Sequence, residues 1–297
     1  MIKIHAFTDA DLDGAGSFLM LKKAFSEDQI TYSVTTEKKF RNSILSWLEN
    51  DDFSNYDTVF ICDLNIKDDI SLIDRDNVIV FDHHKEHTEL LDQYTKAKPV
   101  VKDYSSCTLL MYEALKLKDK LNDYQKLLVK IVDDYDSYQL KIPYSRSLNQ
   151  IFWNYTGDRV HKFISDFDNG FNGFNLYHKN ALRIVERKIN DYFKTEQLFK
   201  GSIKLGDSQY TILGGFFTFP PNEISERALR ENNGDIIILM NMKTKTCTFR
   251  KAKNCSVNMG KLAEKLAGGG GHEDAAGCLL NDNIINITKL LEPICQK

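Results

Sequence analysis

The residues with the clearest chemical potential are acids and histidines that follow three apolar runs, each at the point where the run stops. They are Asp9, Asp11 and Asp13 after the first run, Asp63 after the second, and Asp82, His83 and His84 after the third. Carboxylates packed closely would repel one another, and some would have to take up a proton. Divalent cations remove that conflict, and oxygen ligands with one or two imidazoles suit Mn²⁺ or Mg²⁺ better than zinc. The pattern predicts a two-metal site, which could activate a water and stabilise the oxyanions of a phosphoryl transfer.

Each part of this pattern has a simpler explanation when it is taken alone. The three aspartates could be an acidic helix start, which the helix dipole favours. Their alternate spacing resembles a calcium loop, but an EF-hand needs a glutamate at its twelfth position, where this chain has Met20. Two adjacent histidines could form a polar turn. The combination of all three clusters favours a metal centre.

The elements that must position these residues alternate between strands and helices. Short apolar runs such as TVFIC and VIVF are typical of strands buried on both faces of a parallel sheet. The carboxyl ends of such strands form one rim, where ligands bind. We expect strands at 2–7, 31–34, 58–62 and 78–81, and helices at 15–25, 40–48, 107–117, 121–133 and 159–167.

A long helix at about 176–199 leads into a second region that is again rich in strands. Strands are expected at 209–213, 235–240 and 246–250, and a helix at 259–266 runs into four glycines. The predicted fold class is α/β. We expect an N-terminal parallel-sheet domain at 1–180, a linker helix at 181–200 and a smaller C-terminal α/β domain at 201–297. A length of 297 residues fits two domains that each bury a core.

Composition narrows the classes of function. An apolar fraction of 42% and a charged fraction of 27% are typical of a folded globular protein. The net charge of −3 argues against a protein that coats nucleic acid through bulk charge, but leaves room for a local basic groove. The N-terminus does not resemble a signal peptide, and no apolar stretch is long enough to span a membrane. We therefore expect a cytoplasmic protein with no membrane partner.

These motifs resemble those of the DHH family of phosphoesterases, which is named for the triplet seen here at residues 82–84. TDADLDG is similar to the family's first motif, HxDxDG, with Asp9 in place of the histidine, as in the RecJ-like exonucleases. VFICDLNI resembles the second motif. IVDDYDSY resembles the fourth, which supplies one more aspartate. Asp134 is the favoured choice there, with Asp133 and Asp136 as alternatives.

The resemblance implies a metal-binding role for each matching position. Asp9 and Asp11 would bind the first ion, Asp13, His83 and Asp134 the second, and Asp63 both. The ions would be two Mn²⁺, with Mg²⁺ as the alternative that the extra carboxylate of Asp9 favours. Catalytic roles would fall to Asp82, His83 and His84. Asp82 would orient His83 through its other ring nitrogen, and His84 would face the scissile phosphate.

The end of the chain resembles the DHH-associated C-terminal domain, whose signature is an arginine on a strand followed by GGGH and AAG. Glycines let backbone amides approach a phosphate closely, and an arginine can bind two phosphate oxygens at once. The predicted substrate-binding residues are His84, Arg250, Gly269, Gly270, Gly271 and His272. A glycine run by itself could instead be a flexible loop.

Two further predictions concern side chains outside these motifs. His87 is expected to line the rim or to face solvent. Trp153 is expected in the core, although Phe152, Trp153 and Tyr155 lie where a nucleobase contact could be built.

We therefore predict a two-metal phosphodiesterase, a hydrolase of the exonuclease or oligoribonuclease type. It would cleave short RNA or DNA oligonucleotides or nucleotides to nucleoside monophosphates. Alternatives in the same class are a 3′-phosphoadenosine 5′-phosphate phosphatase and a cyclic-dinucleotide phosphodiesterase. The alternative from another class is a nucleotide-binding sensor without hydrolytic activity, and a homodimer is left open.

Overall fold

The computed structural model describes residues 2–26, 28–217, 221–271, 273–288 and 291–294. It divides into two compact units, Met1–Arg183 and Ile184–Lys297, and each is described here by itself. The boundary falls within the long helix α9 (Leu176–Thr195). Within the described ranges, no helix combines the length and the apolar character needed to cross a bilayer.

The N-terminal unit is built on a five-stranded parallel sheet with the order β2-β1-β3-β4-β5. Its strands are β1 (Lys3–Asp9), β2 (Gln29–Thr35), β3 (Thr58–Cys62), β4 (Val78–Asp82) and β5 (Lys98–Val101). Its helices before α9 are α1 (Leu12–Ala24), α2 (Phe40–Leu48), α3 (Ile70–Ile73), α4 (Lys85–Thr88), α5 (Cys107–Ala114), α6 (Asp123–Asp136), α7 (Ser145–Asn154) and α8 (Arg159–Phe167).

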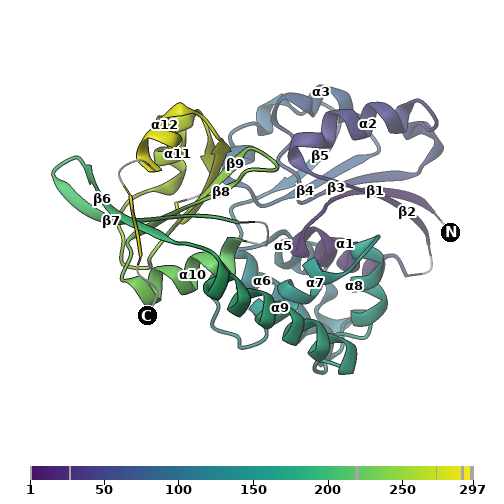
Figure 1. Ribbon diagram of the computed structural model, residues 1–297. Helices are drawn as coiled ribbons and strands as arrows, with labels where there is room; N and C mark the ends of the chain where they lie inside the picture. The colour runs from purple at the N-terminus through teal and green to yellow at the C-terminus, as the bar shows by residue number, and fades with distance from the viewer. Residues whose placement is uncertain (1, 27, 218–220, 272, 289–290, 295–297) are drawn as a thin grey trace. The chain divides into compact units, whose positions relative to one another are not determined.

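Alternate residues of the central strands enter two separate apolar cores, one on each face of this sheet. Ala6 and Phe60 join the core shared with α1, α5 and α6, whereas Phe7 and Ile61 join the core shared with α2 and α3. Figure 1 shows these helices on the two faces of the sheet. The prediction of strands buried on both faces is confirmed, and with it the α/β fold class.

The C-terminal unit holds a seven-stranded mixed sheet with the order β10-β11-β9-β8-β7-β6-β12. Its strands are β6 (Phe199–Leu205), β7 (Ser208–Phe216), β8 (Ile236–Asn241), β9 (Thr246–Lys251), β10 (Gly270–Gly271), β11 (Ala275–Leu279) and β12 (Glu292–Pro293). Its helices are α10 (Pro221–Asn232), α11 (Met259–Ala267) and α12 (Asp282–Thr288). Among the described strand pairs of this second sheet, β7–β8 is parallel and the others are antiparallel.

Some elements differ from the sequence-based expectation. The helix α9 ends at Thr195, and residue 199, expected as its last residue, instead begins β6. The strand β5 was not expected, because its KPVV sequence is short and carries a proline, which suits only an edge strand. This strand does lie at the edge of the sheet.

Candidate metal centre

The acidic rim lies at the carboxyl ends of three neighbouring strands. Asp9 is the last residue of β1, Asp63 directly follows β3, and Asp82 is the last residue of β4. The strand registers pair Thr8 with Cys62 and Cys62 with Phe81, so the three strands end at the same level. These acids therefore lie together along one edge of the sheet, as predicted.

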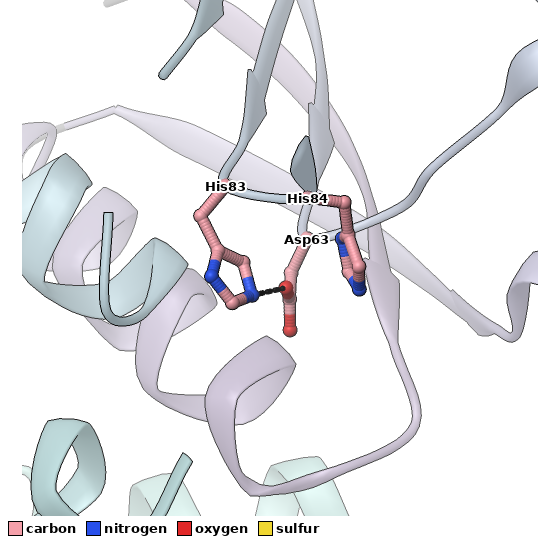
Figure 2. Close-up of side chains that lie close together, drawn as sticks. All are labelled: Asp63, His83 and His84. Carbon is pink, nitrogen blue, oxygen red and sulfur yellow. Dashed lines mark ion pairs between the residues drawn. The ribbon is translucent and has the colours of Figure 1, made fainter. Parts of the chain in front are cut away.

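Asp63 is held in an unusual backbone conformation at this rim. Its φ of 59° lies in the left-handed region, which an aspartate tolerates better than most residues. Its N–H donates a 2.8 Å hydrogen bond to the carbonyl of Phe81 on the neighbouring strand, and the residue is buried. The Asp63 Oδ1 lies 3.4 Å from His83 Nε2, and Figure 2 marks this contact with a dashed line. One ligand atom each from Asp63, His83 and His84 lies within 4.8 Å of the others.

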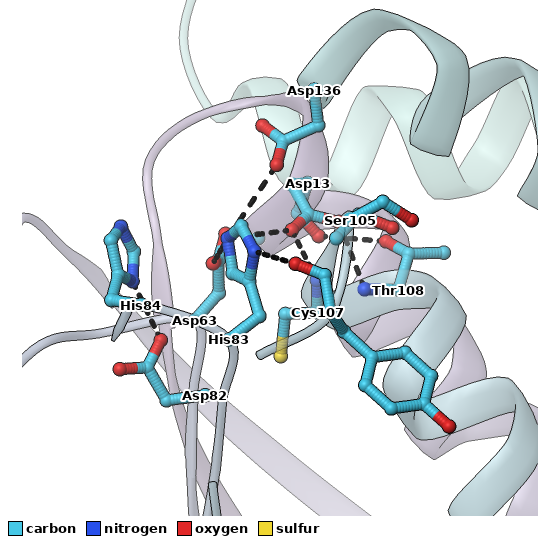
Figure 3. Close-up of polar contacts among 12 residues, drawn as sticks. Asp13, Asp63, Asp82, His83, His84, Ser105, Cys107, Thr108 and Asp136 are labelled. Atoms are coloured by element: carbon cyan, nitrogen blue, oxygen red, sulfur yellow. Dashed lines mark hydrogen bonds and ion pairs between the residues drawn. The ribbon is translucent and has the colours of Figure 1, made fainter. Parts of the chain in front are cut away.

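A second group of ligand atoms, from Asp13, His83 and Asp136, meets the same distance limit (Figure 3). His83 Nε2 lies 3.7 Å from Asp13 Oδ2 and 3.5 Å from Asp136 Oδ2. The Asp13 carboxylate is fixed by the start of α5, because it accepts hydrogen bonds from the N–H groups of Cys107 and Thr108. His83 therefore belongs to both groups and links them.

The structure does not bring Asp134, the favoured aspartate of the fourth motif, to His83; the alternative Asp136 lies there instead. Asp134 accepts hydrogen bonds from the N–H groups of Lys141 and Ile142 and from the hydroxyl of Ser145. Residues that are two positions apart in an α-helix differ by about 200° around its axis. Asp134 and Asp136 therefore point to opposite sides of α6. The alternative Asp133 is also engaged elsewhere, with the hydroxyls of Ser105 and Ser106.

Asp9 and Asp11 lie at the same rim but belong to neither group of ligand atoms. Asp11 is the N-cap of α1 and accepts a 2.9 Å hydrogen bond from the N–H of Gly14. Asp9 accepts one from the N–H of Ala10. The first-ion role predicted for these two residues stays a prediction.

Burial and mutual repulsion disfavour the ionised form of these acids. Burial and the Asp11 carboxylate raise the pKa of Asp9 to about 7. Burial and the charge of Asp13 likewise raise the pKa of Asp11, and raise those of Asp63 and Asp136 well above their usual range. A cluster of this kind, with oxygen ligands and one shared imidazole, fits divalent cations, because positive charge would stabilise the ionised carboxylates.

Asp82 belongs to a separate chain of hydrogen bonds and does not orient His83, contrary to the prediction. Its two oxygens lie 2.7 Å from His84 Nδ1 and 2.6 Å from His87 Nδ1, and His87 Nε2 lies 2.7 Å from the Tyr94 hydroxyl. The Nδ1 of His83 instead lies 3.2 Å from the carbonyl oxygen of Tyr104. A backbone carbonyl therefore does the orienting that was assigned to Asp82.

The relay formed by His84, Asp82, His87 and Tyr94 shifts the pKa values of Asp82 and His84. His87 is fully buried, so the expectation that it lines the rim or faces solvent is wrong. Burial opposes ionisation of Asp82, but hydrogen bonds from His84 and His87 outweigh it and lower the Asp82 pKa. Burial also opposes the charge on His84, but the bond to Asp82 raises the His84 pKa to about 9. His84 is therefore an imidazolium at neutral pH. The spacing of His87, three residues after His84, was the signal in the sequence.

The predicted substrate-binding residues of the C-terminal unit meet around one strand. In the strand register, Ala275 of β11 pairs with Arg250, and Ala276 pairs with Gly271. The Arg250 guanidinium donates two hydrogen bonds to Asn222 Oδ1, at 3.0 and 2.8 Å. His272 lies outside the described residues.

Much of the glycine run is required by packing. Gly268 ends α11 with a left-handed φ of 60°. A Cβ at Gly269 would approach the Gly277 carbonyl oxygen, and one at Gly271 would approach the Ala275 carbonyl oxygen. A Cβ at Gly270 would meet nothing within 4 Å. Of these four glycines, Gly270 alone has neither a left-handed φ nor a neighbour that a Cβ would meet.

Comparison with known proteins identifies the families whose models match this chain. Residues 3–135 match the model of the DHH family, N-terminal domain, and residues 221–297 match that of the DHHA1 domain. The chain is 23% identical to the oligoribonuclease NrnB of Bacillus subtilis, over 95% of this chain and 74% of that protein.

Solved structures share the fold at lower identity. A pGpG-specific phosphodiesterase, PggH of Vibrio cholerae, has a TM-score of 0.60 and 15% identity, over 97% of this chain and 96% of that one. An exonuclease RecJ bound to manganese has a TM-score of 0.51 and 12% identity, over 97% of this chain and 88% of that one.

Proposed function

Because the chain belongs to the DHH family and is a metal-dependent phosphoesterase, we propose that it cleaves short oligonucleotides or dinucleotides to nucleoside monophosphates. The observation that carries the proposal is the meeting of Asp13, Asp63 and Asp136 around a single imidazole, that of His83. The choice of substrate is supported by two relatives, which are named an oligoribonuclease and a pGpG-specific phosphodiesterase.

We propose that the rim holds two divalent ions. Asp9, Asp11 and Asp63 would hold one, and Asp13, Asp63, His83 and Asp136 the other. Mn²⁺ is the proposed ion, and Mg²⁺ is the alternative for a site so rich in carboxylates. When bound, such ions supply a water that is nucleophilic at neutral pH and positive charge that offsets the phosphate oxygens.

The chain's own residues have complementary tasks. The carbonyl of Tyr104 orients the His83 ring, so that Nε2 points toward the carboxylates. Asp82 accepts from His84 Nδ1 and keeps the imidazolium charged, so that its Nε2–H can donate to an oxygen of the substrate phosphate. His87 holds the second oxygen of Asp82, which prevents that carboxylate from turning away.

The C-terminal residues Arg250, Gly269, Gly270, Gly271 and His272 stay candidates for substrate binding. Gly270 has the best claim among the glycines, because packing does not account for it. Arg250 would have to keep or exchange its hydrogen bonds with Asn222 on binding a phosphate.

The test is a product analysis with Mn²⁺ present. RNA and DNA oligomers of graded length, 3′-phosphoadenosine 5′-phosphate, and linear and cyclic dinucleotides are incubated with the protein, and the products are separated by chromatography. We expect monophosphates from linear substrates of two to a few nucleotides. Turnover of phosphoadenosine phosphate alone, or of cyclic dinucleotides alone, would replace the proposed substrate. Binding that persists in chelator without turnover would favour a sensor.

A further inference from the structure

The N-terminal unit has a pocket of about 470 Å³ that reaches the acidic rim. Its lining residues are Ala10, Tyr32, Val34, Gly157, Asp158, Arg159 and Val160. Ala10 stands between Asp9 and Asp11, and its N–H donates to the Asp9 carboxylate. The volume is within the range of roughly 300–1,000 Å³ that is typical of small-molecule sites. The pocket therefore borders the acidic rim at Ala10.

One wall of the pocket is formed by the edge strand β2. Val34 pairs with Thr8 and Tyr32 with Ala6, so both lie on the same face, just before the rim. The Tyr32 ring packs on Phe18, with 4.5 Å between ring centroids, and Val34 is exposed. This wall offers a fixed aromatic and aliphatic surface of the kind on which a nucleobase can rest.

The opposite wall is the start of α8, and its two charged residues differ in their partners. Asp158 is engaged by the chain itself, because it accepts hydrogen bonds from the N–H of His161 and from the Tyr32 hydroxyl. The guanidinium of Arg159 lies 4.5 Å from the centroid of the Trp153 ring. It makes no hydrogen bond or ion pair with any residue that the structure describes. Its donors are thus available to a ligand, while the aromatic ring holds their plane in place.

Trp153 was expected in the core, but it is 43% exposed and serves as the platform for Arg159. Arginine held on an aromatic face binds phosphate through a preformed planar fork. The pocket lining therefore holds one cation, Arg159, and one carboxylate, Asp158, whose two oxygens already accept hydrogen bonds from the chain. The cation and the wall of Tyr32 and Val34 together match one nucleotide, which carries an anionic phosphate and a flat base.

We propose that this pocket binds the nucleotide next to the scissile phosphate, with Arg159 on that nucleotide's own phosphate and Tyr32 and Val34 against its base. The proposal rests on the proposed function, since it names a subsite of the same centre. The pocket would make a substrate with a neighbouring nucleotide better than one that offers a phosphodiester alone.

The experiment compares two substrates in Mn²⁺: a 5′-phosphorylated trinucleotide, and bis(p-nitrophenyl) phosphate, which has a cleavable diester but no second phosphate. The variant R159Q removes the charge, and V34E places an acid on the opposite wall. The readout is the ratio of kcat/KM for the trinucleotide to kcat/KM for the small diester. We expect R159Q to lower this ratio about 10- to 100-fold, the range for a lost charge-assisted hydrogen bond, and V34E to lower it through repulsion of the phosphate.

R75Q is the matched control. Arg75 also lies over an aromatic ring, that of Phe53, but in the turn before β4, at the opposite end of the strand from the rim. It should leave the ratio at the wild-type value, and thermal melting checks the folding of all three variants.

The outcomes separate the two proposals. If the wild type cleaves both substrates and R159Q and V34E leave the ratio unchanged, or lower both activities equally, the pocket is not a nucleotide subsite. If the wild type cleaves the small diester but no oligonucleotide, the proposed substrate class fails, and the pocket proposal falls with it. If the ratio falls in both variants but not in R75Q, both proposals stand.

Discussion

The acidic rim of the N-terminal unit and the glycine run of the C-terminal unit carry the two most recognisable motifs of the chain, yet their residues have different surroundings. At the rim, Asp63 and Asp136 face a shared imidazole and have raised pKa values. In the glycine run, Gly269 and Gly271 press against the β11 segment. The rim gathers charges that repel one another, whereas much of the glycine run serves packing. A motif can therefore indicate chemistry in one unit and architecture in the other.

The same contrast exists within one helix, where Asp134 and Asp136 lie two residues apart. The Asp134 carboxylate is satisfied by the loop that follows α6. Although burial opposes it, the hydroxyl of Ser145 and the N–H groups of Ile142 and Lys141 lower the Asp134 pKa. The Asp136 pKa moves the other way because burial adds to the charges of other acids. Opposite pKa shifts thus distinguish a structural acid from a candidate metal ligand.

The largest predicted effect separates these two aspartates. D136N should lower kcat/KM at least about 100-fold, since even indirect partners of metal ligands typically cost 10- to 100-fold. D134N should keep most of the activity but lower the free energy of unfolding by about 1–2 kcal/mol, because it weakens buried hydrogen bonds. Kinetics in Mn²⁺ and denaturant titration measure the two quantities. If D134N lost the Mn²⁺ dependence and D136N did not, the original interpretation of the fourth motif would be restored.

The second prediction concerns the relay behind His84. H87A should lower kcat about 10- to 100-fold, because Asp82 loses the partner that holds one of its oxygens. With Asp82 in place, activity that needs the imidazolium of His84 should decline as the pH rises through about 9. In H87A this decline should move to lower pH, as Asp82 turns away.

A structural role for His87 alone would lower activity equally at every pH. The control is Y94F, which removes only the far end of the relay and should shift the profile less. Rate profiles between pH 6 and 10 separate these outcomes.

The sequence was sufficient to predict the parallel sheet and the acids at its rim. Runs such as TVFIC are apolar throughout, so their burial on both faces and their common direction follow from composition and order. The position of Asp63 after such a run was enough to bring it to the rim.

At two places the sequence could not predict the direction in which a side chain points. Asp133, Asp134 and Asp136 share one short motif, and only the actual helical phase of α6 decides which of them points at His83. The partner of Asp82 depended on the short helix α4, which turns His87 back into the core. In both cases the residue type could be read from the sequence, but the direction in which the helix points the side chain could not.

The third prediction tests the charge of the rim without relying on catalysis. The pKa values of Asp9, Asp63 and Asp136 are raised in the folded protein, so the folded state holds protons that the unfolded chain has released. In chelator, the contribution of these groups to the free energy of unfolding should therefore be fully present below about pH 4. It should be lost as the pH rises toward 7 and above. We expect the melting temperature in chelator to be roughly 5 °C or more lower at pH 8 than at pH 5.

Added Mn²⁺ should reverse much of that decline at pH 8, because a ligand that binds only the folded state stabilises it. D63N supplies the control, since it removes one repelling charge and should flatten the pH dependence in chelator. Equal melting temperatures at pH 5 and pH 8 in wild type and D63N would show that the rim carries no such strain.

The smallest predicted effect returns to the glycine run and separates its two explanations. G271A should lower the free energy of unfolding by about 1–3 kcal/mol, because the residue has a φ of 146° and its Cβ would press on Ala275 and Ala276. G270A should change it by less than about 0.5 kcal/mol, since its Cβ meets nothing within 4 Å. If Gly270 serves phosphate approach, G270A should nevertheless raise KM for an oligonucleotide. A G270A variant with normal stability and normal KM would show that Gly270 serves neither packing nor substrate binding, and would leave the run without evidence of a role in phosphate approach.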